Sequence, residues 1–283
     1  MRITELLSNK VAAQNARVVF PEHEEPRIEQ AMEKLARDGL CQPICLGDDT
    51  DQYAEVLVKT RGMKEGIARR LVTKPLYRAA AMVAAGEADA MVAGAVAPSR
   101  RVIEAASMAI GLADGVSVPS SFFLMLFPDE RALIFADCAV NVAPDADVLT
   151  SIARSSHATG QALLGEARVA LLSFSTMKSG AGDSVDVVRQ VAERTGFLGP
   201  VQGDAALIPE IAQRKGAGAG DANVLIFPSL DAGNIAYKLA VALGGAQALG
   251  PILQGFRKPV CDLSRGATVD DIVDATVVTL ALS

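Results

Sequence analysis

The most informative stretch of this sequence is the turn between a short apolar run, residues 259–263, and the helical segment that starts at Thr268. The run predicts a buried strand, and the turn after it holds Ser264, Arg265 and Gly266. In open α/β sheets, ligands bind beyond the carboxyl ends of the strands. The start of the helix adds free N–H groups and a partial positive charge, and Arg265 adds a bidentate donor. The turn therefore predicts a site for an anion or an oxyanion.

Asp271 lies in the first turn of the same predicted helix and has two interpretations. Thr268-x-x-Asp271 has the spacing of a capping box, with Thr268 as the N-cap. A desolvated aspartate also has the tunable pKa that a general base needs. The spacing alone favours the cap over the base.

A second loop of similar form follows the strand-like residues 168–175 and precedes a helical segment. It holds Ser175, Thr176 and Lys178 in a glycine-rich stretch, and such a backbone can cradle phosphate. The loop lacks the GxxxxGK[ST] pattern of a P-loop. The sequence of the loop alone favours a plain loop with Ser184 as a helix cap, and Ser175, Thr176 and Lys178 stay candidate substrate-binding residues.

Histidine and cysteine chemistry has little support. His23 and His157 are the only histidines, and no GxSxG motif predicts a hydrolase triad. Cys41 and Cys45 flank a strand-like run, with no histidine following at zinc spacing. We interpret these two cysteines, and the others at positions 138 and 261, as reduced and mostly buried thiols of a cytosolic protein.

Strand-like apolar runs alternate with helical periodicity along most of the chain. This alternation predicts βαβ units and a mostly parallel, doubly wound α/β sheet. One segment departs from it, because the strand-like residues 120–127 and 131–138 are separated only by "PDE". That spacing is too short for a parallel crossover and predicts an antiparallel hairpin. We therefore expect a second domain to begin near residues 115–137.

Composition narrows the classes of protein that remain. The chain has 283 residues, of which 50% are hydrophobic, and a formal net charge of −6. It carries no long Lys/Arg cluster, so we expect no nucleic-acid partner. The N-terminus lacks the apolar core of a signal peptide, and Glu87 and Asp89 interrupt the most apolar region. We therefore expect a cytoplasmic protein that does not contact the membrane.

Several long strings of residues closely resemble the phosphate acetyl/butyryltransferase family, and the phosphotransacetylases above all. The strings cover nearly the whole chain: "ARVVFPEHEEPRIEQA", "ADAMVAGAV", "IFADCAVNVAPDAD", "RVALLSFST", "GDANVLIFPSLDAGNIAYKLA" and "GGAQALGPILQGFRKPVCDLSRGATVDDIV". The resemblance implies an enzyme that moves an acetyl or short acyl group between coenzyme A and phosphate. It implies no metal and no redox cofactor, with coenzyme A, acyl-CoA, phosphate and acyl phosphate as substrates.

The resemblance also implies an architecture. Family members fold as two α/β domains with a cleft between them, similar to isocitrate and isopropylmalate dehydrogenases, and usually form homodimers. We expect a first domain of residues 1–115 plus 258–283, which carries the catalytic motif. The second domain, residues 116–257, is expected to form the dimer interface.

The resemblance assigns roles to the turn described first. It implies that Asp271 takes the proton from the thiol of coenzyme A, although the same carboxylate can also cap the helix in another state. Ser264 is then expected to hydrogen-bond the oxyanion, and Arg265 to bind the phosphate. Asn234, in one of the matching strings, is also expected to bind substrate.

The chain departs from the family's pattern after its Gly-Ala turn. The family continues with a His-Thr-Thr-like run and a phosphate-binding arginine, whereas this chain has Ala97, Pro98 and, in place of the arginine, Glu104. Arg100 and Arg101 lie one helical turn earlier and are expected to supply the missing cation. A phosphate butyryltransferase-like enzyme and a non-catalytic ligand-binding homologue are the alternatives to an acetyltransferase.

Overall fold

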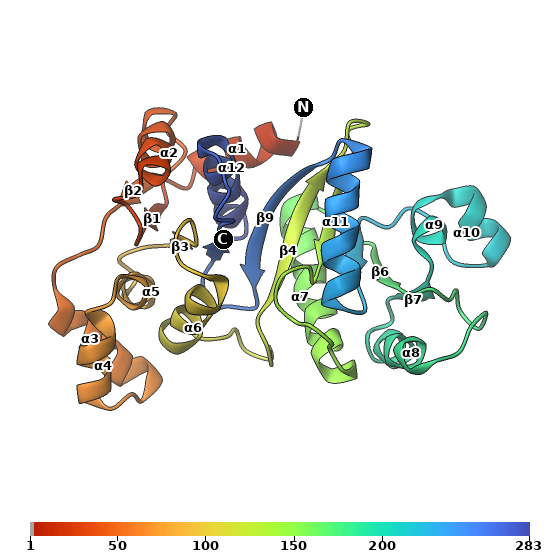
Figure 1. Cartoon of the computed structure of the whole chain (residues 1–283), viewed down its shortest axis with the longest axis horizontal. Helices are drawn as coiled ribbons and strands as arrows, with labels where there is room; N and C mark the ends of the chain where they lie inside the picture. The colour runs from red at the N-terminus through yellow and green to blue at the C-terminus, as the bar shows by residue number, and fades with distance from the viewer. Residues whose placement is uncertain (1–2) are drawn as a thin grey trace. The chain divides into compact units, whose positions relative to one another are not determined.

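The computed structural model describes residues 3–283 as two compact units (Figure 1). Unit 1 combines the residues up to Gly115 with Gly250–Ser283, and unit 2 is Val116–Leu249. The C-terminal piece of unit 1 thus begins earlier than residue 258, where the sequence predicts it. The reason is that strand β9 already pairs with strand β10 at Ile252 and Leu253.

Unit 1 contains a mostly parallel sheet in the order β2-β1-β3-β10-β9. Its strands are β1 (Arg17–Val19), β2 (Gln42–Ile44), β3 (Ala90–Ala93), β9 (Gln247–Gln254, which crosses the boundary between the units) and β10 (Val260–Asp262). The β1·β2, β1·β3 and β3·β10 pairs are parallel, and only the β9·β10 pair is antiparallel. The chain runs outward from β1 to β2 and then returns to β3 on the other side. The carboxyl ends of β1 and β3 therefore form the switch point where ligands bind in such sheets.

Helices cover both faces of this sheet, as the doubly wound class predicts. α2 and α12 contact each other on one face, and α5 and α6 contact each other on the other face (Figure 1). The helices are α1 (Ile3–Ala12), α2 (Pro26–Arg37), α3 (Thr50–Arg61), α4 (Glu65–Val72), α5 (Pro75–Ala85), α6 (Ser99–Ala109) and α12 (Val269–Leu280). α2 illustrates why they form, since Glu25 caps its first N–H groups, Pro26 starts it, and Ile28 and Leu35 are fully buried.

Unit 2 begins with the predicted antiparallel hairpin. Phe122 in β4 faces Ala136 in β5, and Leu126 faces Ala132 at the other end of the ladder. The strand order is β4-β5-β8-β6-β7, and every pair beyond the hairpin is parallel. The strands are β4 (Ser120–Leu126), β5 (Ala132–Ala136), β6 (Val169–Leu172), β7 (Leu198–Val201) and β8 (Val224–Ile226).

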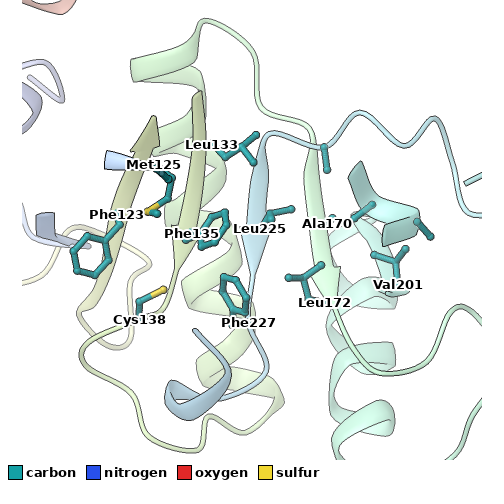
Figure 2. Close-up of a cluster of buried hydrophobic side chains, with 14 of the residues drawn as sticks. Phe123, Met125, Leu133, Phe135, Cys138, Ala170, Leu172, Val201, Leu225 and Phe227 are labelled. Carbon is teal, nitrogen blue, oxygen red and sulfur yellow. The ribbon is translucent and has the colours of Figure 1, made fainter. Parts of the chain in front are cut away.

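The core of unit 2 lies between this sheet and its helices. Figure 2 shows Phe123, Phe135, Leu225 and Leu172, from four different strands, in one buried cluster. Neighbouring strands thus present side chains to the same face, as the two-residue period of a strand requires. The helices of unit 2 are α7 (Ala146–Leu164), α8 (Asp183–Thr195), α9 (Gly203–Leu207), α10 (Pro209–Lys215) and α11 (Leu230–Gly244).

The structure confirms that the cysteines are free and mostly buried thiols. All four cysteines are free thiols, and Cys41, Cys138 and Cys261 are buried whereas Cys45 is exposed. Burial raises the pKa of Cys41 and of Cys261 to about 12, which leaves both as unreactive thiols. His157 stacks on Phe197 at 5.2 Å between ring centroids, an ordinary packing role. No helix among residues 3–283 is long and apolar enough to cross a membrane.

Candidate active site

The turn between β10 and α12 stands open to solvent directly after a buried strand. Asp262 and Leu263 are buried, whereas Ser264 and Arg265 are exposed. The Leu263 N–H donates to Ala93 O at 2.6 Å, so the pairing of β10 with β3 continues up to the turn. The Ser264 Oγ accepts from the Gly266 N–H at 3.3 Å. A hydroxyl and a guanidinium are thereby presented at the carboxyl end of a central strand.

Asp271 forms the capping box that the spacing predicts. Its Oδ2 accepts from the Thr268 N–H at 2.9 Å and from the Thr268 hydroxyl at 2.8 Å, while the Asp271 N–H donates to Thr268 Oγ1 at 3.2 Å. Its Oδ1 accepts no hydrogen bond from any residue that the structure describes. The side chain is exposed, so one carboxylate oxygen caps α12 and the other remains available to take a proton.

Arg27, in the first turn of α2, holds this turn in place, and its role was not predicted. Its Nη1 donates to the carbonyl oxygens of Arg265 at 2.9 Å and Ala267 at 2.7 Å, and its Nη2 donates to Ala95 O at 3.3 Å. Glu25 orients the guanidinium by accepting from its Nε at 2.7 Å. One side chain thus ties the Ser264–Arg265 turn to the loop after β3.

The loop after β3 is itself organised around a carboxylate. Glu22, from the loop after β1, accepts from the backbone N–H groups of the four consecutive residues Gly94, Ala95, Val96 and Ala97 at 2.6–3.2 Å. Successive N–H groups that converge in this way form an anion-binding nest. Here the nest binds a side chain of the protein, and this fixes the backbone beside the switch point. A sequence signal existed, since Glu22 follows one strand and Gly94 follows its neighbour.

A cavity of about 700 Å³ opens at the switch point of unit 1. Its lining includes His23, Lys74, Tyr77 and Arg101, in addition to residues of the loops after β1 and β3, whereas the Ser264–Arg265 turn does not line it. Both predicted substitute cations are exposed, and of the two only Arg101 lines this cavity.

Glu104 lies beside Arg101 and neutralises part of its charge. The Arg101 Nη1 lies 3.6 Å from Glu104 Oε2. Burial and the hydrogen bond to Glu104 raise the pKa of Tyr77, so this phenol remains protonated. The acid that replaces the family's arginine therefore has an arginine and a phenol as its partners.

The remaining predicted site residues lie in unit 2. Ser175 and Thr176 are buried, and their polar atoms bond within the unit: Thr176 Oγ1 with Gln202 Oε1 at 3.1 Å, and Ser175 Oγ with Ser179 Oγ at 3.3 Å. Lys178 is exposed, and of these three side chains it alone is open to a ligand. Asn234 donates from Nδ2 to Cys138 O at 3.2 Å, which joins α11 to the chain after β5. The substrate-binding roles of these residues stay predictions.

Metal ligation has no support within the described part of the chain. No group of three or more His, Cys, Asp or Glu side chains there is arranged to hold a metal ion. The chemically active groups that the described residues offer at the site are a hydroxyl, guanidinium groups and carboxylates.

Comparison with known proteins agrees with this geometry. Residues 2–56 and 48–280 match the family model described as phosphate acetyl/butaryl transferase. The phosphate acetyltransferase of Thermoanaerobacterium thermosaccharolyticum is 37% identical over 99% of this chain and 98% of its own. A phosphotransacetylase structure from Streptococcus pyogenes is 34% identical, covers 99% of this chain and 97% of its own, and superposes with a TM-score of 0.92.

A more distant likeness concerns the fold alone. A Salmonella typhimurium structure described as a 4-hydroxythreonine-4-phosphate dehydrogenase is 12% identical, covers 95% of this chain and 99% of its own, and has a TM-score of 0.54. This agrees with the dehydrogenase-like α/β architecture that the sequence predicts. Given the match along nearly its whole length, this chain belongs to the phosphate acetyl/butyryltransferase family.

Proposed function

We propose that this protein is an acyltransferase that catalyses acetyl-CoA + phosphate = acetyl phosphate + CoA. The observation that supports it most directly is the turn after β10. There an exposed hydroxyl and an exposed guanidinium precede a helix whose Asp271 keeps one carboxylate oxygen free. Family membership identifies the chemistry for which such a turn is suited.

In the proposed mechanism, Asp271 Oδ1 takes the proton from the thiol of coenzyme A. The thiolate attacks the carbonyl carbon of acetyl phosphate, and the Ser264 hydroxyl donates to the oxyanion that forms. The bond from the carbonyl carbon to the phosphate oxygen then breaks, and phosphate leaves with the electron pair, held by Arg265. The catalytic power comes from proximity and electrostatic stabilisation, without an acyl group on the protein.

This mechanism uses protein side chains alone, so we propose that the enzyme needs no metal or redox cofactor and binds coenzyme A as a substrate. We also propose a cytoplasmic location. The support for it is that all four cysteines are free thiols, one of them exposed, as is typical of a reducing compartment.

A thiol-release assay tests the function. The protein is mixed with acetyl-CoA, propionyl-CoA or butyryl-CoA in the presence of phosphate or arsenate, and free thiol is measured. We expect release that depends on both substrates and is fastest with acetyl-CoA. Fastest release with butyryl-CoA would assign the enzyme to the longer acyl chain, and no release with any of the three would make it a non-catalytic homologue.

The cation that replaces the missing arginine gives one testable prediction. Arg101 lines the cavity, so we expect Arg101→Glu to raise the KM for phosphate about tenfold or more, because it reverses the charge that meets the anion. The KM for coenzyme A should change much less. Arg100→Glu is the matched control, since it makes the same charge change on the adjacent residue, which does not line the cavity. Equal effects of the two variants would refute a specific role for Arg101.

We further propose that the enzyme is a homodimer in which α11 of unit 2 forms part of the interface. Ile235, Leu239 and Leu243 are spaced four residues apart on α11 and are 57%, 51% and 83% exposed. An apolar stripe of this kind on a soluble helix is typical of an interaction surface. A twofold axis would place the same stripe of each subunit against the other.

The dimer proposal predicts a change of mass in solution. Leu239→Asp together with Leu243→Asp should shift the protein from dimer to monomer in size-exclusion chromatography with light scattering, because charge is introduced on both turns of the stripe. Leu6→Asp on α1 is the control, as Leu6 is 44% exposed and lies outside the stripe. A wild-type protein that is monomeric at all concentrations, or a double variant that stays dimeric, would contradict this interface.

A further inference from the structure

Asp262 is a buried acid at the edge of the candidate site, and the mechanism above does not use it. It is the last residue of β10, two positions before Ser264, and is 2% exposed. Within the described part of the chain, its Oδ1 is the only buried side-chain nitrogen or oxygen atom without a hydrogen-bond partner. Leaving a buried acceptor unsatisfied costs free energy. The unpartnered oxygen of Asp262 therefore destabilises the folded state next to the Ser264–Arg265 turn.

The partner of the carboxylate comes from a different segment of the site. Ser99 is the first residue of α6, and its hydroxyl lowers the pKa of Asp262, as a hydrogen-bond donor to a carboxylate does. No side chain caps the N-terminus of this helix. Asp262 thus connects the end of β10, which continues into Ser264 and Arg265, with the start of the helix that carries Arg100 and Arg101.

The unpartnered oxygen lies against the backbone of the turn. A Cβ atom built on Gly94 would lie 2.7 Å from Asp262 Oδ1, 2.6 Å from Leu263 N and 2.7 Å from Leu263 O. All three atoms therefore border the same side of Gly94. When it is ionised, Oδ1 can only accept a hydrogen bond. When it is protonated, Oδ1 can donate one, and the Leu263 carbonyl oxygen is an acceptor on the same side of Gly94. A change of protonation would act directly on the residue before Ser264.

Burial and the neighbouring groups together determine the pKa of Asp262. Burial is the main cause that raises its pKa to about 6, Ser99 lowers it, and the negative charge of Glu22 raises it. Cys261 is the adjacent residue, and neither β3 nor β9 carries a titratable side chain. On α6, Arg101 pairs with Glu104, and Arg100 is exposed. On α12, Asp270 pairs with Lys34, which Asp274 also faces, and Asp271 caps the helix.

We propose that Asp262 is a positioning residue of the acyl-transfer site. Its ionised carboxylate anchors the start of α6 to the end of β10 and so holds the Ser264–Arg265 turn in its working position. A proton on Asp262 weakens the hydrogen bond from Ser99, because a neutral acceptor is weaker than a charged one, and redirects Oδ1 toward Leu263. This inference rests on the proposed acyl transfer, and it adds Asp262 as the group that holds the Ser264–Arg265 turn in the position needed for catalysis.

The test compares the pH dependence of kcat/KM for wild type, Asp262→Asn and Asp114→Asn. Asparagine has nearly the same size as aspartate and lacks the charge, so it imitates the protonated carboxyl at every pH. We expect Asp262→Asn to lower kcat about 10- to 100-fold, the range for a reacting group misplaced by about 1 Å, with KM values changed about threefold or less. Its profile should also lack the acid limb near pH 6. Asp114 is an exposed aspartate of unit 1, and its variant should match wild type.

Ser99→Ala supplies a second test that leaves Asp262 in place. The Ser99 hydroxyl lowers the pKa of Asp262, so its removal should move the acid limb of kcat/KM to higher pH. The ionisation of the substrates is the same for all the enzymes, so only the differences between variants are compared. Ser99 is exposed at the first position of a helix, and the change should have little effect on folding.

Urea unfolding as a function of pH gives a readout that needs no substrate. The raised pKa means that the folded state keeps a proton between about pH 4 and pH 6 that the unfolded state has released. Wild type therefore loses this stability as the pH rises through 6, and Asp262→Asn does not. We subtract the urea midpoint of wild type from that of Asp262→Asn at each pH, and we expect this difference to be more positive at pH 8 than at pH 5.

The outcomes separate the two proposals. If wild type is active, and Asp262→Asn has the same kcat and the same acid limb in its pH profile, this result overturns the positioning role alone. So does a loss of activity that parallels a lower urea midpoint at pH 8, since that is the result of a merely structural residue. If the acid limb of kcat/KM lies at the same pH in Ser99→Ala as in wild type, the positioning role alone is also overturned. A folded wild type with no transfer of any acyl group contradicts the proposed function itself, and the positioning role with it.

Discussion

Asp271→Asn is expected to lower kcat by about 10²- to 10⁴-fold while folding stability changes by about 1 kcal/mol or less. The amide oxygen of asparagine can still accept from the Thr268 N–H and hydroxyl, so the capping box survives. The amide cannot take the thiol proton. A thiol with a pKa near 8.5 is only a few per cent ionised at pH 7, which is why a positioned base has a large effect.

Two further variants separate the base from the cap. Thr268→Ala removes the cap and should cost about 1 kcal/mol in urea unfolding, with kcat per folded molecule close to wild type. Asp270→Asn changes the neighbouring aspartate, which pairs with Lys34 on α2, and should leave kcat nearly unchanged. If Asp271→Asn unfolds much more easily but turns over normally per folded molecule, Asp271 is a cap and the proposed mechanism loses its base.

Gly94→Ala is expected to destabilise the protein by about 3 kcal/mol or more. Gly94 has φ +107°, a backbone conformation that is strained for any residue with a side chain. The added Cβ would also lie 2.6–2.7 Å from Leu263 N, Leu263 O and Asp262 Oδ1, and two of these atoms are backbone. Relief would require β3 and β10 to separate at the active-site end, so activity should fall as well.

Gly86→Ala is the matched control for this change. Gly86 ends α5 in the same unit with φ +78°, and nothing lies within 4 Å of a Cβ built there. It therefore measures backbone strain without a collision, about 1 kcal/mol. Chemical denaturation of both variants gives the difference. If Gly94→Ala loses no more stability than Gly86→Ala, the contact between the two strand ends is looser than the structure shows.

Local patterns predicted most of the fold. The alternation of apolar runs with helical periodicity gave the βαβ units, and the "PDE" spacing gave the antiparallel β4·β5 hairpin. β9 was missed because Gly250 and Pro251 lie within it, and glycine and proline are unfavourable inside a strand. The boundary between the units was misplaced for the same reason, since recognising β9 would have moved it to Gly250.

The candidate site was predicted only where its parts are close in sequence. Ser264, Arg265 and the Thr268–Asp271 box lie within eight residues, so spacing alone could indicate them. Arg27 contacts a carbonyl 238 residues away, and Glu22 contacts N–H groups 72 or more residues away. No periodicity records such contacts, because they exist only after β1, β3 and β10 lie side by side. The orphaned oxygen of Asp262 is invisible in the sequence for the same reason.

Unit 1 consists of two stretches that the whole of unit 2 separates along the chain, and this affects how the protein is made. During translation, residues 116–249 leave the ribosome before the segment that completes unit 1, so unit 2 can finish folding first. Until β10 emerges, the edge of β3 that it covers is open to pairing with other chains. A nascent chain thus exposes that edge for the time needed to synthesise unit 2. A chaperone that binds this protein during synthesis would have its greatest effect in that interval.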